Sequence, residues 1–456
     1  MKREKSIFPV KLTLILCILA ALYAVSVVIY LYVEEGKPLG GRDFHQFWYA
    51  GHFVLQGTDP YGAYFARELP RLPIKYLDGV TVTKYPVAQG KLAIIPSNTP
   101  MMLLLLTPFS WFSWNVAKWL FLIVNVILML ITGWLVLRQV PFGGVQLARL
   151  DELLIFLIYF DLSATRIAIE NGQTTLLVFL LMLIAILYAD RLWPMAGLAL
   201  GIALSKYSLS LPIFLFLLYK KNFKVLLSAI AVQVLGLIGL AAISGNSPIT
   251  VALENYRLFF QLFDQPGVHL ARQFEIITNN HLLTQIPVLM MTLLVFLPIF
   301  LWLRNRPFKT KAEEEVLDFH LLSILFLWTI LVAYHRLYDT LILLFFIVLM
   351  FKGFAYPNIW NLSKREQILL LAFMAWIPPI LILPARIVNK VIPDYYGTIS
   401  DAATSVFLVV MLFISMFLVR RFLQNAETET ILERAESHEI PNDSHRETQP
   451  RWVSNS

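Results

Sequence analysis

Asp43 carries the carboxylate that the sequence places most distinctively, just after the first long apolar run. It follows a Gly-Gly turn at residues 40 and 41. Apolar residues recur after it every three to four positions, which predicts a helix to about Gln56 with Asp43 at its N-cap. Such a helix would lie along the membrane surface and hold the carboxylate beside an arriving lipid head group. The alternative is that Asp43 only caps the helix.

Lys206 is the second candidate, because it interrupts an apolar stretch between Pro194 and Tyr219. Each half of this stretch has about 12 residues, roughly 18 Å of helix, whereas bilayer hydrocarbon is about 30 Å thick. We therefore predict a hairpin of two half-helices with Lys206 at its inner bend. An ionisable residue at membrane depth is costly and so is a functional candidate, here as a partner for phosphate. The alternative is that its side chain extends to an interface.

Further polar residues lie in connections between apolar runs. His335 and Arg336 separate two such runs, His281 follows two asparagines in a loop, and Glu170 and Gln173 bound a short turn. The alternative for His335 and Arg336 is an aromatic and basic belt at the membrane interface. For His281 it is a solvated loop histidine, and for Glu170 and Gln173 it is a polar helix cap. One carboxylate with several cations suits transfer from a lipid phosphate. The carboxylate takes a proton from an acceptor hydroxyl, and the cations stabilise the departing phosphate.

Several motifs of nucleotide and hydrolase chemistry are absent from the sequence. It has no Gly-rich phosphate loop, no His-Glu-x-x-His, no Gly-x-Ser-x-Gly and no Rossmann fingerprint. It also lacks an Asp-x-Asp pair that would hold a metal beside a nucleotide-sugar diphosphate. We therefore expect no metal site, no cofactor and no cytoplasmic nucleotide-dependent active site.

The composition places these residues in a membrane protein. The 456-residue chain is 58% hydrophobic and 14% aromatic, with a mean hydropathy of +0.68, which is too apolar for a soluble protein of this length. Lys and Arg gathered in cytoplasmic loops explain the net charge of +7 better than a nucleic-acid partner does. Cys17 is the single cysteine, which excludes an intramolecular disulfide and a cysteine metal site.

The elements that must position the candidates are membrane-spanning helices. Ten apolar runs are read as spans: 10–33, 115–137, 153–169, 174–189, 223–243, 286–303, 317–334, 338–351, 367–383 and 402–419. The first has no cleavage pattern and is expected to remain in the chain. The shorter run at 100–111 suits an interfacial helix.

The basic residues give an orientation. If each run crosses once, the basic clusters fall on one face, which positive-inside bias assigns to the cytoplasm. Asp43 and the connections at 170–173 and 334–336 then lie outside. We expect a transmembrane domain over 1–421, which includes extracytoplasmic loops at 34–98 and 244–285. A disordered cytoplasmic tail is expected over 422–456.

The order of several short motifs resembles glycosyltransferase family 87, a group of polyprenyl-phosphate-sugar-dependent, mannosyltransferase-like enzymes of the GT-C superfamily. The resemblance covers about 12–419. Its motifs are Asp43-Phe44, Gly57-Thr58-Asp59-Pro60-Tyr61, Tyr85-Pro86, Asn171-Gly172-Gln173-Thr174, Ala196-Gly197-Leu198-Ala199 leading to Lys206, and Tyr334-His335 with Tyr338-Asp339.

The resemblance implies a GT-C-type fold and a catalytic Asp in the first extracytoplasmic loop, here Asp43. That residue would act as general base in an inverting transfer that requires no metal. The resemblance also implies a mannose-type or other sugar on a polyprenyl phosphate, with the phosphate held by basic and histidine residues, best matched by Lys206 and His335. The full set of expected substrate-binding residues is Lys206, His335, Arg336, Gln173, His281 and Tyr85.

We therefore predict a hexosyltransferase of the bacterial-type inner membrane with an extracytoplasmic active site. Its partners would be a polyprenyl-phosphate sugar donor, a lipid-linked or polymeric glycan acceptor and the bilayer, without nucleic acid. A transporter or flippase for lipid-linked sugars is an open alternative, because it would use the same charged cavity without making a bond. A structural scaffold in an envelope complex is a third possibility.

Overall fold

The computed structural model describes residues 4–5, 7–35, 41–65, 98–144, 146–262, 270–271, 274, 285–304, 310–333, 335, 337–381 and 400–439. Apart from turns, these residues are helical, with one two-residue parallel pairing of β1 (Glu4–Lys5) with β2 (Gln146–Leu147). The predicted all-α polytopic membrane fold is confirmed. The predicted count of about ten spans is not.

Seven helices within these ranges are long and apolar enough to cross a membrane. They are Trp114–Gln139, Trp193–Tyr219, Phe223–Ser244, Gln285–Leu303, Lys311–Val332, Leu337–Ala355 and Thr404–Asn425. Ser163–Asn171 and Thr175–Tyr188 add an eighth candidate if they are one span bent by 112°. The short apolar helix expected at 100–111 is present as α5 (Pro100–Leu106) followed by η4 (Thr107–Trp111).

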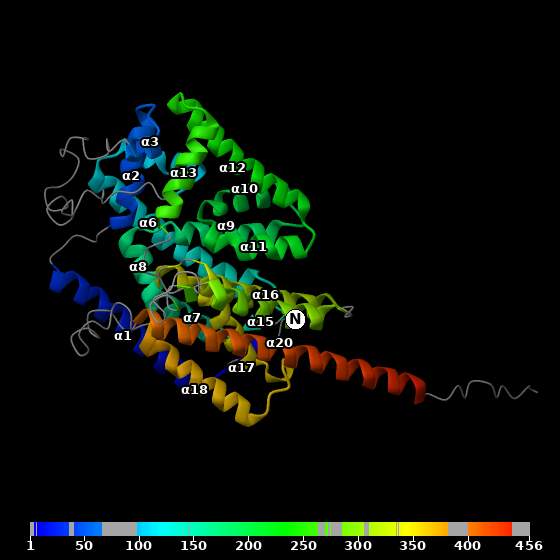
Figure 1. The fold of residues 1–456 in the computed structure, drawn as a ribbon. Coiled ribbons are helices and arrows are strands. Elements are labelled where there is room, and N and C mark those ends of the chain that lie inside the picture. The colour runs from blue at the N-terminus through cyan, green and yellow to red at the C-terminus, as the bar shows by residue number, and fades with distance from the viewer. Residues whose placement is uncertain are drawn as a thin grey trace, which may run out of the picture.

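The remaining elements of the first half of the chain are α1 (Val10–Glu35), α2 (Arg42–Leu55), α3 (Pro60–Phe65), α6 (Trp114–Trp134), η5 (Leu135–Gln139), α7 (Arg149–Asp161), α8 (Ser163–Asn171), α9 (Thr175–Tyr188), α10 (Trp193–Ala203), η6 (Leu204–Lys206) and α11 (Tyr207–Tyr219). Those of the second half are α12 (Phe223–Ser244), α13 (Pro248–Leu262), α15 (Gln285–Leu303), α16 (Lys311–Val332), η8 (Leu337–Leu343), α17 (Leu344–Ala355), η9 (Pro357–Ile359), α18 (Lys364–Leu381) and α20 (Ser400–Glu439). Figure 1 shows α9 to α12 in green beside the yellow and orange helices of the C-terminal half.

The segment Trp193–Tyr219 folds back on itself. Asp190, just before it, accepts a hydrogen bond of 3.3 Å from Asn222, just after it. A straight helix of 27 residues would instead separate its two ends by about 40 Å. The structure therefore has the predicted hairpin of half-helices, with Lys206 at the bend between α10 and α11. Trp193–Tyr219 is among the seven candidates by its total length, but it does not cross as one straight helix.

Contacts along the hairpin fix the direction of each half. α10 runs parallel to α12, because the Gln233 side chain donates hydrogen bonds to the carbonyl of Gly201 at 2.5 Å and to Ser205 at 3.2 Å. α11 returns antiparallel to α16: the Thr329 hydroxyl donates to the Ser208 carbonyl at 2.9 Å near the bend, and Lys220 reaches Glu314 at 2.5 Å at the other end. Gln233 is about 11 residues into α12, roughly 16 Å from its start, so the bend lies near the middle of a bilayer about 30 Å thick.

α2 begins and ends close to the prediction but is more buried than a helix on a membrane surface. The expected N-cap is wrong, since the N-cap is Gly41 and Asp43 lies in the first turn. Trp48 is fully buried, and its indole donates a 3.0 Å hydrogen bond to the carbonyl of Phe112. Phe44 stacks on Phe121 of α6 with ring centroids 4.0 Å apart. The chain after α5 thus covers the apolar side of α2, which was expected to lie on the membrane surface.

α20 differs from the predicted C-terminal organisation. The last apolar run was expected to end near residue 419 and to be followed by a disordered tail from residue 422. In the structure one helix covers Ser400–Glu439 (Figure 1). Residues 422–439 are therefore helical, because each added residue of an established helix gains a backbone hydrogen bond without a new nucleation cost. Residues 440–456 lie outside the described residues.

Candidate active site

The Asp43 carboxylate is bound by a side chain from another part of the chain. Its Oδ2 accepts a hydrogen bond from the amide of Gln173, 130 positions later in the sequence. Asp43 is half-buried, and the N-cap position of α2 is occupied by Gly41. The structure thus argues against the reading of Asp43 as only a helix cap.

Gln173 lies in the connection 171–174, directly after the C-terminal end of α8. The backbone N–H groups of Gly172 and Gln173 donate to the carbonyls of Ile169 and Ala168, at 3.1 and 2.8 Å, which is the Schellman pattern. Gly172 has a φ of +65°, a conformation that glycine adopts without strain. α9 then starts at Thr175, bent by 112° from α8. The local sequence therefore ends one helix, turns the chain sharply and aims Gln173 at Asp43.

Gly172 also allows the close approach of α2. A Cβ on Gly172 would lie 2.6 Å from the Cβ of Phe44, the residue after Asp43. We expect Gly172→Ala to displace α2, to lower the melting temperature and to reduce turnover. The left-handed backbone alone costs alanine about 1–2 kcal/mol, and the clash adds to that. Gly245→Ala is the matched control, because Gly245 has a φ of +68° but no atom within 4 Å of the point where an alanine Cβ would lie. Equal effects of the two substitutions on turnover would contradict the packing role.

Lys206 is bound to two other side chains at the hairpin bend. Its ammonium donates to the Thr175 hydroxyl at 2.6 Å and forms an ion pair with Asp339. The Tyr338 ring centroid lies 4.8 Å from the Nζ atom, within reach of a cation–π interaction. The Lys206 side chain is 17% exposed, so it has not extended to an interface. The snorkelling alternative therefore does not describe this lysine.

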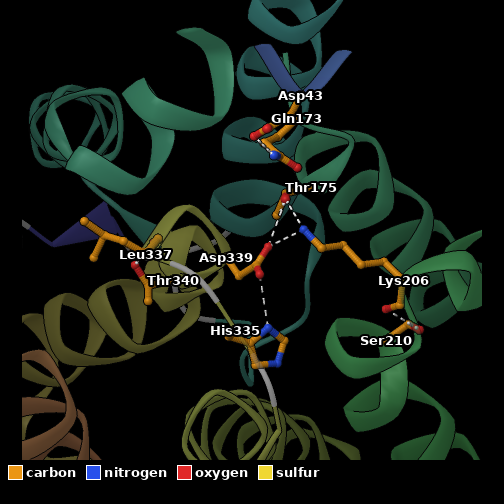
Figure 2. A network of polar contacts seen from close by, with 9 residues as sticks. All are labelled: Asp43, Gln173, Thr175, Lys206, Ser210, His335, Leu337, Asp339 and Thr340. Carbon is orange, nitrogen blue, oxygen red and sulfur yellow. Dashed lines mark hydrogen bonds and ion pairs between the residues drawn. The ribbon is translucent and has the colours of Figure 1, made fainter. Parts of the chain in front are cut away.

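Asp339 joins the network from the first turn of η8 and is almost fully buried. Its Oδ1 accepts from Lys206 and from the Thr175 hydroxyl, the latter at 3.0 Å. Its Oδ2 lies 3.2 Å from Nδ1 of His335, which is also fully buried. Figure 2 shows Asp43 and Gln173 on one side of this chain of contacts and His335 on the other. The structure therefore brings Lys206 and His335 together, but His335 faces Asp339 and not Asp43.

The other predicted site residues have different outcomes. Gln173 is buried and contacts Asp43 directly. His281, Arg336 and Tyr85 lie outside the described residues. In the sequence Asp339 is recognised only within the motif Tyr338-Asp339, with no function assigned to it. The signal that could have identified it is a carboxylate four positions after His335, at the start of an apolar run. Among the residues that the structure describes, no group of three or more His, Cys, Asp or Glu side chains could hold a metal ion.

A second polar cluster lies farther along the Asp43 side of the bundle. Buried Asp59 accepts from the backbone N–H of Tyr61 at 2.9 Å and from the Asn246 side chain at 3.3 Å, which joins α3 to the start of α13. The carboxyl groups of Glu254 on α13 and of Asp59 both lie beside Gly62. Burial, and then the neighbouring Asp59 carboxylate, raise the pKa of Glu254 to about 7, although nearby Arg257 opposes the shift.

This pair predicts that the contact between α3 and α13 weakens as pH rises. The folded protein holds a proton on Glu254 that the unfolded chain has lost above about pH 4.5, so the stabilisation is complete below that pH and is lost as pH passes about 7. We expect the protection factors of amides in α3 and α13, which are corrected for the rise of the intrinsic exchange rate with pH, to be larger at pH 5.5 than at pH 8.5. Glu254→Gln should abolish the difference, because its amide does not titrate. Glu313→Gln, at the start of α16, is the control. A pH response that persists in Glu254→Gln would contradict the assignment.

Comparison with known proteins found a family whose sequence pattern matches this chain. The sequence pattern described as glycosyltransferase family 87 matches residues 97–337, which is more than half of the 456 residues. The matched region contains Gln173, Lys206 and His335, whereas Asp43 and Asp339 lie outside it. Neither the curated proteins nor the solved structures gave a match.

Proposed function

Since this chain belongs to glycosyltransferase family 87, we propose that it moves a sugar, of the mannose type or another hexose, from a polyprenyl phosphate to a lipid-linked or polymeric glycan. That the chain is a membrane glycosyltransferase follows from its family and from its membrane-spanning helices. Such an enzyme needs a sugar donor, a glycan acceptor and the bilayer. The GT-C architecture remains a prediction.

The contact between Asp43 and Gln173 carries the mechanistic part of the proposal. Gln173 orients the carboxylate, and Thr175, two residues later, binds Lys206 at 2.6 Å. A carboxylate that can accept a proton is therefore connected, through Gln173 and Thr175, to a cation that can bind phosphate (Figure 2). This arrangement supports general-base catalysis paired with charge stabilisation of the leaving group.

In the proposed reaction Asp43 removes the proton from an acceptor hydroxyl. The acceptor oxygen then bonds to the anomeric carbon on the face opposite the phosphate, and the bond from that carbon to the phosphate oxygen breaks. The electron pair leaves with the prenyl phosphate, whose new charge Lys206 offsets, with His335 supporting the site through Asp339. Attack from the opposite face inverts the anomeric centre.

A transfer assay separates this function from its main alternative. Purified protein in detergent would be incubated with a radiolabelled polyprenyl-phosphate sugar and candidate glycan acceptors. The enzyme yields a larger labelled glycoconjugate, whereas a flippase leaves the donor intact. Absence of product with every acceptor, together with movement of intact donor across vesicle membranes, would contradict the proposed function.

The orientation of the site is proposed from the basic residues. One end of the bundle, which we call the Lys220 end, is tied together by contacts such as Lys220 with Glu314, Tyr356 with Gln146 at 2.8 Å, and Arg138 with Glu152. Its basic residues include Arg138, Arg149, Arg191, Lys220, Lys221, Lys224, Lys311 and Lys352. Positive-inside bias assigns that end to the cytoplasm of a bacterial-type inner membrane, so Asp43 faces the opposite side.

Cysteine labelling of intact cells tests this orientation. In a Cys17→Ser background, we expect Ile249→Cys at the exposed start of α13 to react with a membrane-impermeant thiol reagent. Lys221→Cys, in the turn between α11 and α12, should react only after the cells are opened. The reverse pattern would place the active site in the cytoplasm.

A further inference from the structure

The Lys206 ammonium already has an anion beside it. Asp339 forms an ion pair with it, and the Asp339 side chain is only 4% exposed. A donor phosphate that binds Lys206 must therefore compete with a buried carboxylate for the same cation. This competition follows only if Lys206 binds phosphate, so the inference rests on the proposed function.

The charges of the network make the competition costly. Asp43 and Asp339 contribute two negative charges and Lys206 one positive charge, so these three residues have a net charge of −1 (−2 + 1). A phosphodiester adds another negative charge in a poorly solvated place. A buried carboxylate that loses its cation without replacement is strongly destabilised.

His335 can supply the replacement. Its Nδ1 lies 3.2 Å from Oδ2 of Asp339, on the side of the carboxylate away from Lys206. Its Nε2 is buried, and no residue in the part of the chain that the structure describes hydrogen-bonds to it. A neutral imidazole that donates from Nδ1 to Asp339 has Nε2 available to take a proton, and the resulting imidazolium would pair with Asp339. The charged groups that face this imidazole within the described network are Asp339 and, beyond it, Lys206.

We propose that Asp339 is the resident counter-ion of Lys206, that the donor phosphate displaces it, and that His335 takes up a proton to hold the displaced carboxylate. Asp339 is then a positioning residue: it keeps Lys206 charged and in place while the site is empty. Donor binding couples to proton uptake, so donor affinity falls as pH rises. The same exchange returns Lys206 to Asp339 when the prenyl phosphate leaves, which favours product release.

The Asp339→Asn variant isolates the competition. Asparagine keeps the size of the side chain and an oxygen that accepts from Thr175 and Lys206, but it removes the competing charge. Lys206 retains the Thr175 hydroxyl at 2.6 Å and the Tyr338 ring at 4.8 Å as partners for its charge. The variant should therefore bind phosphate more tightly than the wild type, whereas loss of a merely structural ion pair would weaken binding.

Calorimetric titration of the detergent-solubilised full chain tests the proposal. The ligand is the methyl ester of a short-chain prenyl phosphate, a phosphodiester that carries one negative charge and does not titrate near neutral pH. Titrations in two buffers of different ionisation enthalpy give both the affinity and the protons taken up. We expect proton uptake by the wild type and none by Asp339→Asn or His335→Gln. Asp339→Asn should bind at least tenfold more tightly, within the usual range of coupling between sites, and His335→Gln more weakly.

Asp318→Asn is the matched control, because Asp318 pairs with Lys220 at 2.9 Å at the opposite end of the bundle. It should bind the ligand as the wild type does. Equal or weaker binding by folded Asp339→Asn, no proton uptake by the wild type, or no binding by any of these proteins would overturn the inference. If Asp339→Asn does not fold, the His335→Gln titration decides alone. Binding as expected without sugar transfer would count against the proposed function and leave the inference standing.

Discussion

Asp43→Asn is expected to abolish sugar transfer while leaving the fold intact. The amide keeps the shape of the side chain and an oxygen for the Gln173 hydrogen bond, but it cannot accept the acceptor's proton. Loss of a general base reduces turnover by about 10²- to 10⁴-fold. The measurement is the initial rate of labelled product formation at saturating donor. Donor binding should change little, because Asp43 acts on the acceptor hydroxyl.

Two further measurements show whether the loss of transfer comes from the missing base and not from unfolding. The melting temperature of Asp43→Asn should stay close to that of the wild type, since asparagine keeps an oxygen that accepts from Gln173. Asp43→Glu keeps a base but displaces it by one methylene, so it should retain more activity than the asparagine variant. Near wild-type transfer by Asp43→Asn would remove Asp43 from the mechanism.

Lys206→Met should impair both stability and donor binding. The substitution leaves Asp339 buried without its cation, and removal of one partner of a buried ion pair costs about 3–5 kcal/mol. We expect the lower end of that range, because the Lys206 side chain is partly exposed. The Kd for a prenyl phosphate should rise at least tenfold, since one charge-assisted hydrogen bond contributes about 1.5–3 kcal/mol. Thermal unfolding and calorimetric titration measure the two effects.

The double variant Lys206→Met/Asp339→Asn separates the effect on stability from the effect on donor binding. It removes both charges, so much of the lost stability should return, but phosphate binding should not. Recovery of binding along with stability would mean that Lys206 only supports the fold. Continued instability of the double variant would mean that the cost lies in packing at the hairpin bend.

The local elements could be predicted from the sequence because each depends on neighbouring residues. A helix satisfies its backbone hydrogen bonds within its own segment, so apolar periodicity was enough to place α2 and α12 close to their observed bounds. The hairpin could be predicted because neither half of Trp193–Tyr219 is long enough to cross the hydrocarbon. For the same reason the sequence indicated that Lys206 lies at the bend. The bend near Leu162 between α7 and α8 was missed, because the run 153–169 was read as one span although its second half carries Ser163, Thr165 and Arg166.

Only the tertiary structure decided which side chains meet. The N-cap prediction for Asp43 failed because backbone angles place Gly41 there, and the carboxylate turned instead to Gln173 on the α8–α9 turn. Asp339 was not selected from the sequence, since a single Asp at the start of an apolar run has no local partner other than His335. Its contacts with Thr175 and Lys206 join residues 164 and 133 positions apart.

The sequence by itself determined that this chain is a helical membrane protein with an acidic candidate at the membrane surface and a basic candidate at membrane depth, because composition and periodicity are local properties. The packing of the helices determined that Asp43 is half-buried, that Lys206 is neutralised by Asp339, and that His335 contacts the other oxygen of the Asp339 carboxylate. Such contacts depend on the order and tilt of separate helices, which no short stretch of sequence encodes.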